Sequence, residues 1–128
     1  MHRYVDSIVD ISKAAVQAIE QGDAVALAEQ MTQAQRLFDT CCQPNSPDQL
    51  AAPHLHMLMS DEILRSCSLA VKGVGSQGDG SAQILCANSE MQNKVMLALF
   101  CLLLLLLFYY LYAMHSAYYY FCILNYFY

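Results

Sequence analysis

The feature that most constrains this chain is the absence of charged residues from its last quarter, residues 95–128. All six Lys and Arg residues and all eleven Asp and Glu residues lie within residues 1–94. Twelve of the aromatic residues, including eight of the nine tyrosines, lie in the charge-free segment. The chain therefore divides into an acidic body, residues 1–94, and an uncharged tail, residues 95–128.

The first part of the tail has the length and composition of a membrane-spanning helix. Residues 95–114 contain no charge, proline or glycine, and residues 102–107 are six consecutive leucines. A helix of this length rises about 30 Å, the thickness of a bilayer's hydrocarbon core. The aromatic residues at 108–110 and 112 would form a belt at one interface, and Lys94 favours a cytoplasmic side for the body. These features predict a membrane anchor.

Two other interpretations of the tail stay open. Leu, Phe, Tyr, Ile and Cys are the residues that T-rich nucleotide sequence encodes, and residues 115–128 remain apolar and aromatic. The composition therefore favours a gene-model artefact over a genuine anchor. A core helix of a soluble protein is the third interpretation, but a helix that is apolar all round needs a larger protein to bury it.

The body has the size of one modest domain, and the net charge of the chain is −5. Its few Lys and Arg residues are not clustered, which argues against a nucleic-acid partner. The six cysteines show no disulfide spacing, so we expect reduced thiols and a cytosolic body. A zinc site could be drawn, but its spacing fits no usual pattern, and we predict no metal. It would use Cys41, Cys42, His54 and His56.

The body begins with a predicted helical hairpin. Residues 4–21 carry apolar residues three and four apart, the spacing of an amphipathic helix. These are Tyr4, Ile8, Ile11, Ala15 and Ile19. Gly22 should end this helix, and Asp23 is placed to cap a second helix over residues 24–41. The apolar face of the second helix is Leu27, Ala28, Met31, Ala34 and Phe38.

A third helix should follow a loop at residues 43–47. Ser46 opens a capping-box pattern with proline at the first helical position. Pro53 interrupts that start, so we predict the longer helix over residues 53–68, with Asp61 and Glu62 on its solvated face. Its apolar residues are Leu55, Leu58, Met59, Ile63 and Cys67.

A glycine-rich loop, residues 72–81, holds four of the five glycines of the chain and lies between two apolar runs. This pattern predicts strand, loop and antiparallel strand, followed by a helix from the capping box at residues 89–92. Closely spaced glycines suit either a tight hairpin or a nest of N–H groups that binds phosphate. The fold class is therefore α+β: a helical hairpin and a third helix packed on a small antiparallel sheet, followed by a hydrophobic C-terminal helix.

This element order and the loop together resemble the C-terminal domain of the GHMP small-molecule kinases. The resemblance covers residues 4–96 and includes the helix segment at residues 91–96. The glycine-rich motif of that family is matched loosely by Lys72, Gly73, Gly75, Gly78 and Gly80. The resemblance implies a cytoplasmic kinase that uses ATP and Mg²⁺ to phosphorylate a small, sugar-like substrate.

The resemblance also implies which residues form the site. The loop would contact substrate and phosphate through Gly73, Gly75, Ser76, Gln77, Gly78, Asp79 and Gly80. Asp79 would either accept a bond from a sugar hydroxyl or cap the turn, and Lys72 would either neutralise phosphate or be solvated. No residue is predicted as a catalytic base.

The chain departs from the family in one major respect. The family's ATP phosphate loop and catalytic acid belong to an N-terminal domain, and no such sequence occurs here. We therefore expect a kinase fragment that binds little ATP and Mg²⁺ and is inactive alone, because phosphoryl transfer depends on positioning the nucleotide. The alternative function is a non-catalytic, tail-anchored membrane protein whose small α+β domain binds a partner.

Overall fold

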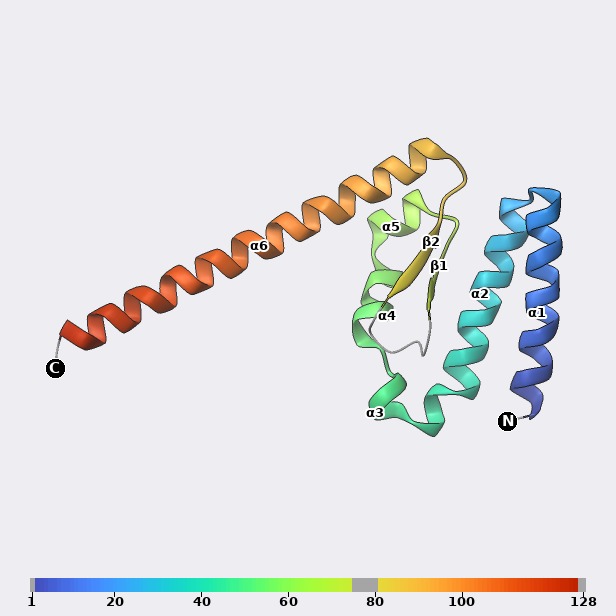
Figure 1. Ribbon diagram of the computed structural model, residues 1–128, viewed down its shortest axis with the longest axis horizontal. Helices are drawn as coiled ribbons and strands as arrows, with labels where there is room; N and C mark the ends of the chain where they lie inside the picture. The colour runs from blue at the N-terminus through green and yellow to red at the C-terminus, as the bar shows by residue number, and fades with distance from the viewer. Residues whose placement is uncertain (1, 75–80, 127–128) are drawn as a thin grey trace. The chain divides into compact units, whose positions relative to one another are not determined.

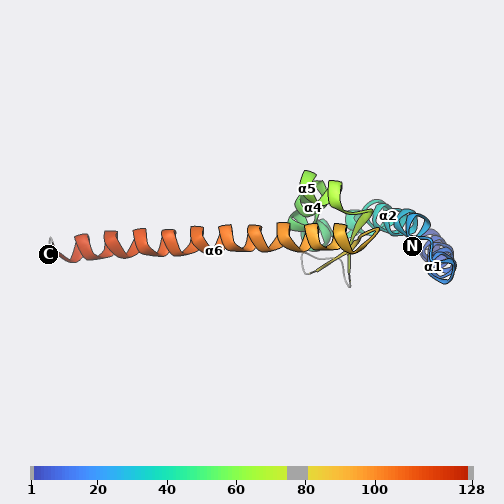
Figure 2. The same ribbon diagram turned by 90° about the horizontal axis from the view of Figure 1, so that it is seen from above.

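A computed structural model describes the backbone of residues 2–74 and 81–126, and side chains over residues 4–74 and 81–114 (Figures 1 and 2). The chain forms two compact units, Met1–Val95 and Met96–Tyr128. The first unit contains the helices and the sheet of the body. The second unit contains most of the last helix, so the boundary lies beside the predicted limit between body and tail.

The predicted helical hairpin is confirmed. Helix α1 is His2–Gln21 and helix α2 is Ala24–Cys41. Gly22 has φ +67°, a left-handed conformation that glycine adopts without strain. Its N–H donates to Ile19 O at 3.1 Å, and the Asp23 carboxylate accepts from Ala26 N–H at 2.9 Å. Local residue chemistry thus ends one helix and starts the next.

The face that α1 turns toward α2 differs from the prediction at its last position. Ala18 is buried, whereas Ile19 is 63% exposed. The half-buried residues of α1 follow the spacing of four and three residues that leads to position 18. Position 19 lies about 100° farther round the helix, so Ile19 belongs to the predicted apolar set but is exposed.

The predicted third helix, residues 53–68, is wrong as a single element. It is divided into α4, Pro53–Ser60, and α5, Glu62–Cys67. Asp61 between them has extended backbone, and its carboxylate accepts from Leu64 N–H at 2.9 Å. Asp61 is therefore a helix cap and not part of a continuous solvated face. The break also shifts the apolar face, so that Leu64 is 3% exposed and Ile63 is 60% exposed.

Two short elements connect α2 to α4. They are the 3₁₀ turn η1, Gln43–Asn45, and helix α3, Pro47–Leu50. The helix begins after Ser46 as predicted, but the Ser46 side chain makes no capping hydrogen bond. Ala52, with φ 44°, then reverses the chain before α4. The predicted capping box thus marks the start of a helix, but the hydrogen bond from the Ser46 side chain is not formed.

The sheet is the predicted antiparallel hairpin. Strand β1, Ala70–Gly73, pairs with β2, Ala82–Leu85, in the register Ala70↔Leu85 to Gly73↔Ala82. The Val74 N–H donates to Ser81 O at 3.1 Å and closes the hairpin beyond the last pair. The strands lie between α2 and the α4–α5 pair (Figure 1). The α+β fold class is therefore confirmed.

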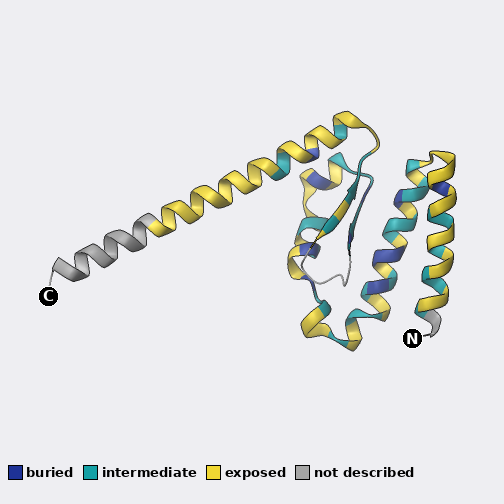
Figure 3. Ribbon diagram, in the orientation of Figure 1, coloured by how far each residue is buried: buried dark blue, intermediate teal, exposed yellow. Residues whose placement is uncertain are grey.

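The core of the first unit has few buried positions (Figure 3), and many of them are small residues. Its buried hydrophobic residues are Ala18, Ala28, Ala34, Phe38, Ala52, Leu55, Leu64, Ala70 and Val95. Alanine allows the hairpin helices to approach closely but buries little apolar surface. Larger aliphatic residues of α1 stay exposed, including Val5, Val9 and Val16.

Helix α6, Ser89–Tyr126, begins one residue after its cap. Asn88 Oδ1 accepts from Met91 N–H at 2.9 Å, so Asn88 and not the predicted Ser89 has the capping role. Lys94 Nζ lies 2.8 Å from Glu90 Oε1, one helical turn away. From residue 100 to residue 114 every side chain is exposed (Figure 3). The hydrophobic C-terminal helix is confirmed.

Candidate functional site

The candidate site begins at Gln35, the buried polar side chain of the described part of the first unit. It is 2% exposed. Its Oε1 accepts from Gly73 N–H at 2.8 Å, and its Nε2 donates to Asp39 Oδ1 at 2.9 Å. A buried amide is stable only when its donor and acceptor are both paired, as here. Gln35 therefore fixes the end of β1, where the glycine-rich loop begins, to α2.

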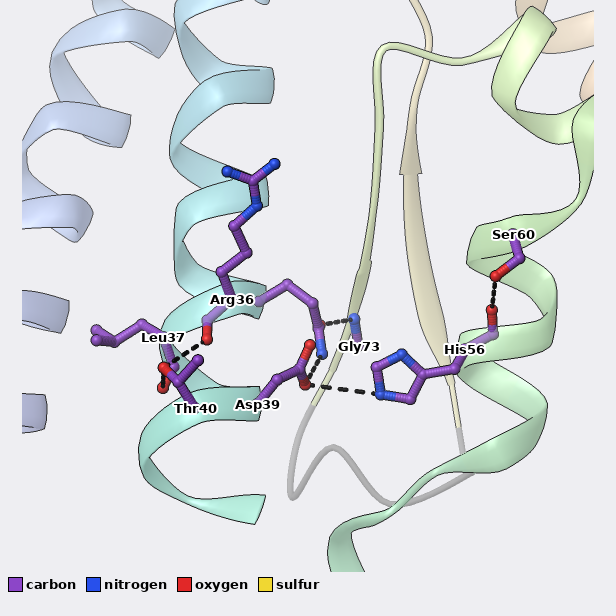
Figure 4. Close-up of polar contacts among 8 residues, drawn as sticks. Arg36, Leu37, Asp39, Thr40, His56, Ser60 and Gly73 are labelled. Carbon is purple, nitrogen blue, oxygen red and sulfur yellow. Dashed lines mark hydrogen bonds and ion pairs between the residues drawn. The ribbon is translucent and has the colours of Figure 1, made fainter. Parts of the chain in front are cut away.

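Asp39 extends this polar contact to a third element. Its Oδ1 lies 3.7 Å from Nε2 of His56 on α4, a contact that is ionic only when the imidazole is protonated (Figure 4). The sequence separates these residues widely, yet the fold brings α2, α4 and β1 to one point. Gly73, Gln35, Asp39 and His56 form what we call the loop-base cluster.

The sequence did not identify Gln35 as a site residue. One signal was present, because Gln35 lies four residues after Met31 and seven after Ala28, within the apolar face of α2. A polar residue in such a face must find a buried partner. The partner is 38 residues away and could not be named from periodicity.

The predicted loop residues are only partly within the described structure. Gly75, Ser76, Gln77, Gly78, Asp79 and Gly80 lie outside the described residues. Gly73 is buried, and its N–H is bonded to Gln35, so it is not free to bind a ligand in this structure. Lys72 Nζ donates to Gly73 O at 2.8 Å. The side chains at the base of the loop thus bind the protein itself.

An open cleft of about 660 Å³ lies beside this base, between α1, α2 and the sheet. Its walls are mainly aliphatic, with Ile8 and Ile11 from α1, Met31 from α2 and Ile84 from β2. Lys72 of β1 supplies its positive charge. The cleft has the volume of a small-molecule site, and the glycine-rich loop leaves the sheet close to it.

The five cysteines whose side chains are described are free thiols. Within residues 4–74 and 81–114, whose side chains the structure describes, no three His, Cys, Asp or Glu side chains gather as metal ligands would. Cys41 and Cys42 lie near Tyr4, at the end of the hairpin opposite Gly22. Burial raises the pKa of Tyr4 above 10.0, and the neighbouring Cys42 and Cys41 raise this pKa further.

The second functional feature is the apolar helix. In the described part of the chain, Ser89–Met114 is long and apolar enough to cross a membrane, and its side chains are almost all exposed. A soluble core helix would be covered by other elements, which is not the case for residues 100–114.

Comparison with known proteins adds no relative. No protein-family model, curated protein or solved structure matches the chain. The resemblance to the GHMP kinases therefore stays a prediction that rests on the residues of the loop and on the order of the elements.

Proposed function

We propose that the first unit is the loop-bearing part of a GHMP-type small-molecule kinase. The observation that carries the proposal is the bond between Gln35 Oε1 and Gly73 N–H, which fixes one end of the glycine-rich loop to α2. The bond between Val74 N–H and Ser81 O holds the two ends together. A loop with a fixed base is what a phosphate cradle requires, because its N–H groups must be positioned before the anion arrives.

In this proposal the chain supplies one wall of a site. N–H groups of residues 75–80 bind the transferred phosphoryl group and the substrate, which is a small, sugar-like alcohol. A second domain would bind ATP and Mg²⁺ and hold the base that takes the proton of the attacking hydroxyl. The oxygen–phosphorus bond to ADP breaks as the bond to the alcohol forms. The chain alone is therefore inactive.

The test supplies the second domain that the proposed site requires. The full chain is fused behind the N-terminal domain of a GHMP sugar kinase, and ADP release is measured with a panel of monosaccharides. We expect sugar-dependent ADP release, and we expect Gly78→Val to abolish it because a side chain there obstructs the loop. Gly22→Asn is the matched control, since asparagine tolerates a positive φ. A fusion that binds nucleotide and releases no ADP with any sugar contradicts the proposal.

A second proposal concerns residues 95–114, which we infer to anchor the chain in a membrane. It is supported by residues 100–114 of α6, which are exposed on every side and carry no charge. Under it, the first unit is a membrane-bound module whose partner binds its exposed helices. The full chain expressed in cells should stay in the membrane pellet after carbonate extraction. Release into the carbonate supernatant would overturn this second proposal.

A further inference from the structure

A second cleft, of about 470 Å³, lies within the first unit between α2, the α4–α5 pair and β1. It differs from the aliphatic cleft because two arginines line it, Arg36 from α2 and Arg65 from the last turn of α5. The chain has only six Lys and Arg residues and a net charge of −5. Two arginines in one cleft therefore make this surface more positive than the chain as a whole.

Neither guanidinium has an ion-pair partner among the described residues. Asp39 is the acidic residue of the cleft, but its Oδ1 accepts from Gln35 and faces His56. Figure 4 shows the Arg36 side chain pointing away from Asp39. The positive charge of the cleft is thus not cancelled by its own carboxylate.

The free hydrogen-bond donors of the cleft define what it can bind. Thr32 Oγ1 donates to Ala28 O at 2.9 Å, and Ser68 Oγ donates to Leu64 O at 2.6 Å. Both hydroxyl protons are committed to the helices, so the free donors are those of the guanidinium groups. Each guanidinium carries five N–H donors in a planar fork and stays protonated at all ordinary pH values.

From these contacts we infer that the cleft binds the phosphate group of a small phosphate monoester. A phosphate carries a charge of about −1.5 to −2 at pH 7 and three terminal oxygens, so two guanidiniums can bind it together. A single carboxylate has one charge and two oxygens, and it satisfies only one of the two arginines. The cleft has the volume of a small-molecule site. This inference uses neither the glycine-rich loop nor the kinase proposal.

The inference is tested by titrating the full chain, in detergent micelles, with glycerol phosphate and with inorganic phosphate. The Nε–H resonances of Arg36 and Arg65 are followed by NMR. We expect both resonances to shift along one saturable curve. Arg36→Gln and Arg65→Gln should each weaken binding about tenfold or more, since each removes a charged hydrogen-bonding partner. Arg36→Lys should weaken it less, because the charge remains and the fork is lost.

Three controls decide the result. Lys13→Gln removes one positive charge from α1, outside the cleft, and should leave the affinity unchanged. Gly78→Val alters the loop of the proposed kinase site and should leave both arginine shifts unchanged, which separates the two proposals. Succinate, a dicarboxylate, should bind more weakly than glycerol phosphate. Absent shifts, equal loss of affinity with Lys13→Gln, or equal binding of succinate would each overturn the inference.

Discussion

Helices α1 and α6 show how differently a sequence can specify the same backbone structure. In α1 apolar residues recur three and four apart, and the half-buried ones face α2 while Asp6, Asp10 and Lys13 face water. In α6 the residues from 100 to 114 are exposed on every side and carry no charge. The position of α1 is therefore set by packing against a named partner. The composition of residues 100–114 specifies no particular contact, and under the anchor proposal their surroundings are an apolar solvent.

The largest expected effect comes from placing charge in the middle of the tail. Leu104→Arg combined with Leu105→Arg should cost about 5–7 kcal/mol of insertion free energy, since each arginine at the centre of a span costs about 2.5–3.5 kcal/mol. Carbonate extraction of cells expressing the chain measures the loss of membrane retention. The double alanine variant at the same positions should stay in the pellet. Retention of the arginine variant would remove the contrast between the two helices.

A core substitution in the first unit should have the next largest effect. Leu64 is 3% exposed, and Leu64→Ala should lower the free energy of unfolding by about 2–5 kcal/mol, the range for buried leucines. Its neighbour Ile63 is 60% exposed, so Ile63→Ala should change that free energy by less than about 0.5 kcal/mol. Urea unfolding in micelles, followed by hydrogen exchange of the first unit, measures both. Equal effects would show that the division at Asp61 is wrong.

Loss of the loop-base cluster should have a smaller but local effect. Gln35→Ala leaves the buried Gly73 N–H without its acceptor, which costs about 1–3 kcal/mol. We expect the Gly73 amide to exchange with solvent much faster, while the amides of α1 are affected less. Gln33→Ala, an exposed glutamine on the same helix, is the control. Unchanged exchange at Gly73 would mean that Gln35 does not hold the loop.

The smallest expected effect is a dependence of the free energy of unfolding on pH, caused by Tyr4 at the end of the hairpin opposite Gly22. Burial and the neighbouring Cys42 raise the pKa of Tyr4 above 10.0, so the folded state holds the phenol proton more tightly than the unfolded state. The stabilisation is fully present below pH 10 and is lost as the pH rises through the higher folded pKa. Urea unfolding at pH 9 and pH 11 should therefore show a smaller decrease for Tyr4→Phe than for the natural chain. If both chains lost the same free energy of unfolding between pH 9 and pH 11, the Tyr4 phenol would be solvated and not buried.

The helical hairpin and the strand pair were predictable because their signals are local. Gly22 and Asp23 end and start helices through their own backbone and side chain, and the apolar periods on either side are regular. The break at Asp61 was not predictable, since the residue can continue a helix or cap one. The capping bond to Leu64 N–H prevailed because it let Leu64 enter the core.

The candidate site was less predictable than the fold. The glycine-rich loop is visible in the sequence, but the residue that holds its base, Gln35, acts over a separation of 38 residues. Arg36 and Arg65 lie on separate elements, and they line one cleft only because of the positions of α2 and α5. Packing between elements far apart in the sequence decides these contacts. The spacing of apolar residues within one helix carries no information about such packing.

We propose that one chain combines a hydrogen-bonded body with a tail suited to an apolar solvent. Hydrogen–deuterium exchange of the full chain in lipid bilayers tests both parts in one measurement. We predict strong protection of amides 96–114 and of the Gly73 amide, with rapid exchange at an exposed connection of the body, residues 87 and 88. Rapid exchange across residues 96–114 in bilayers, at the rate of unstructured peptide in water, would contradict the claim.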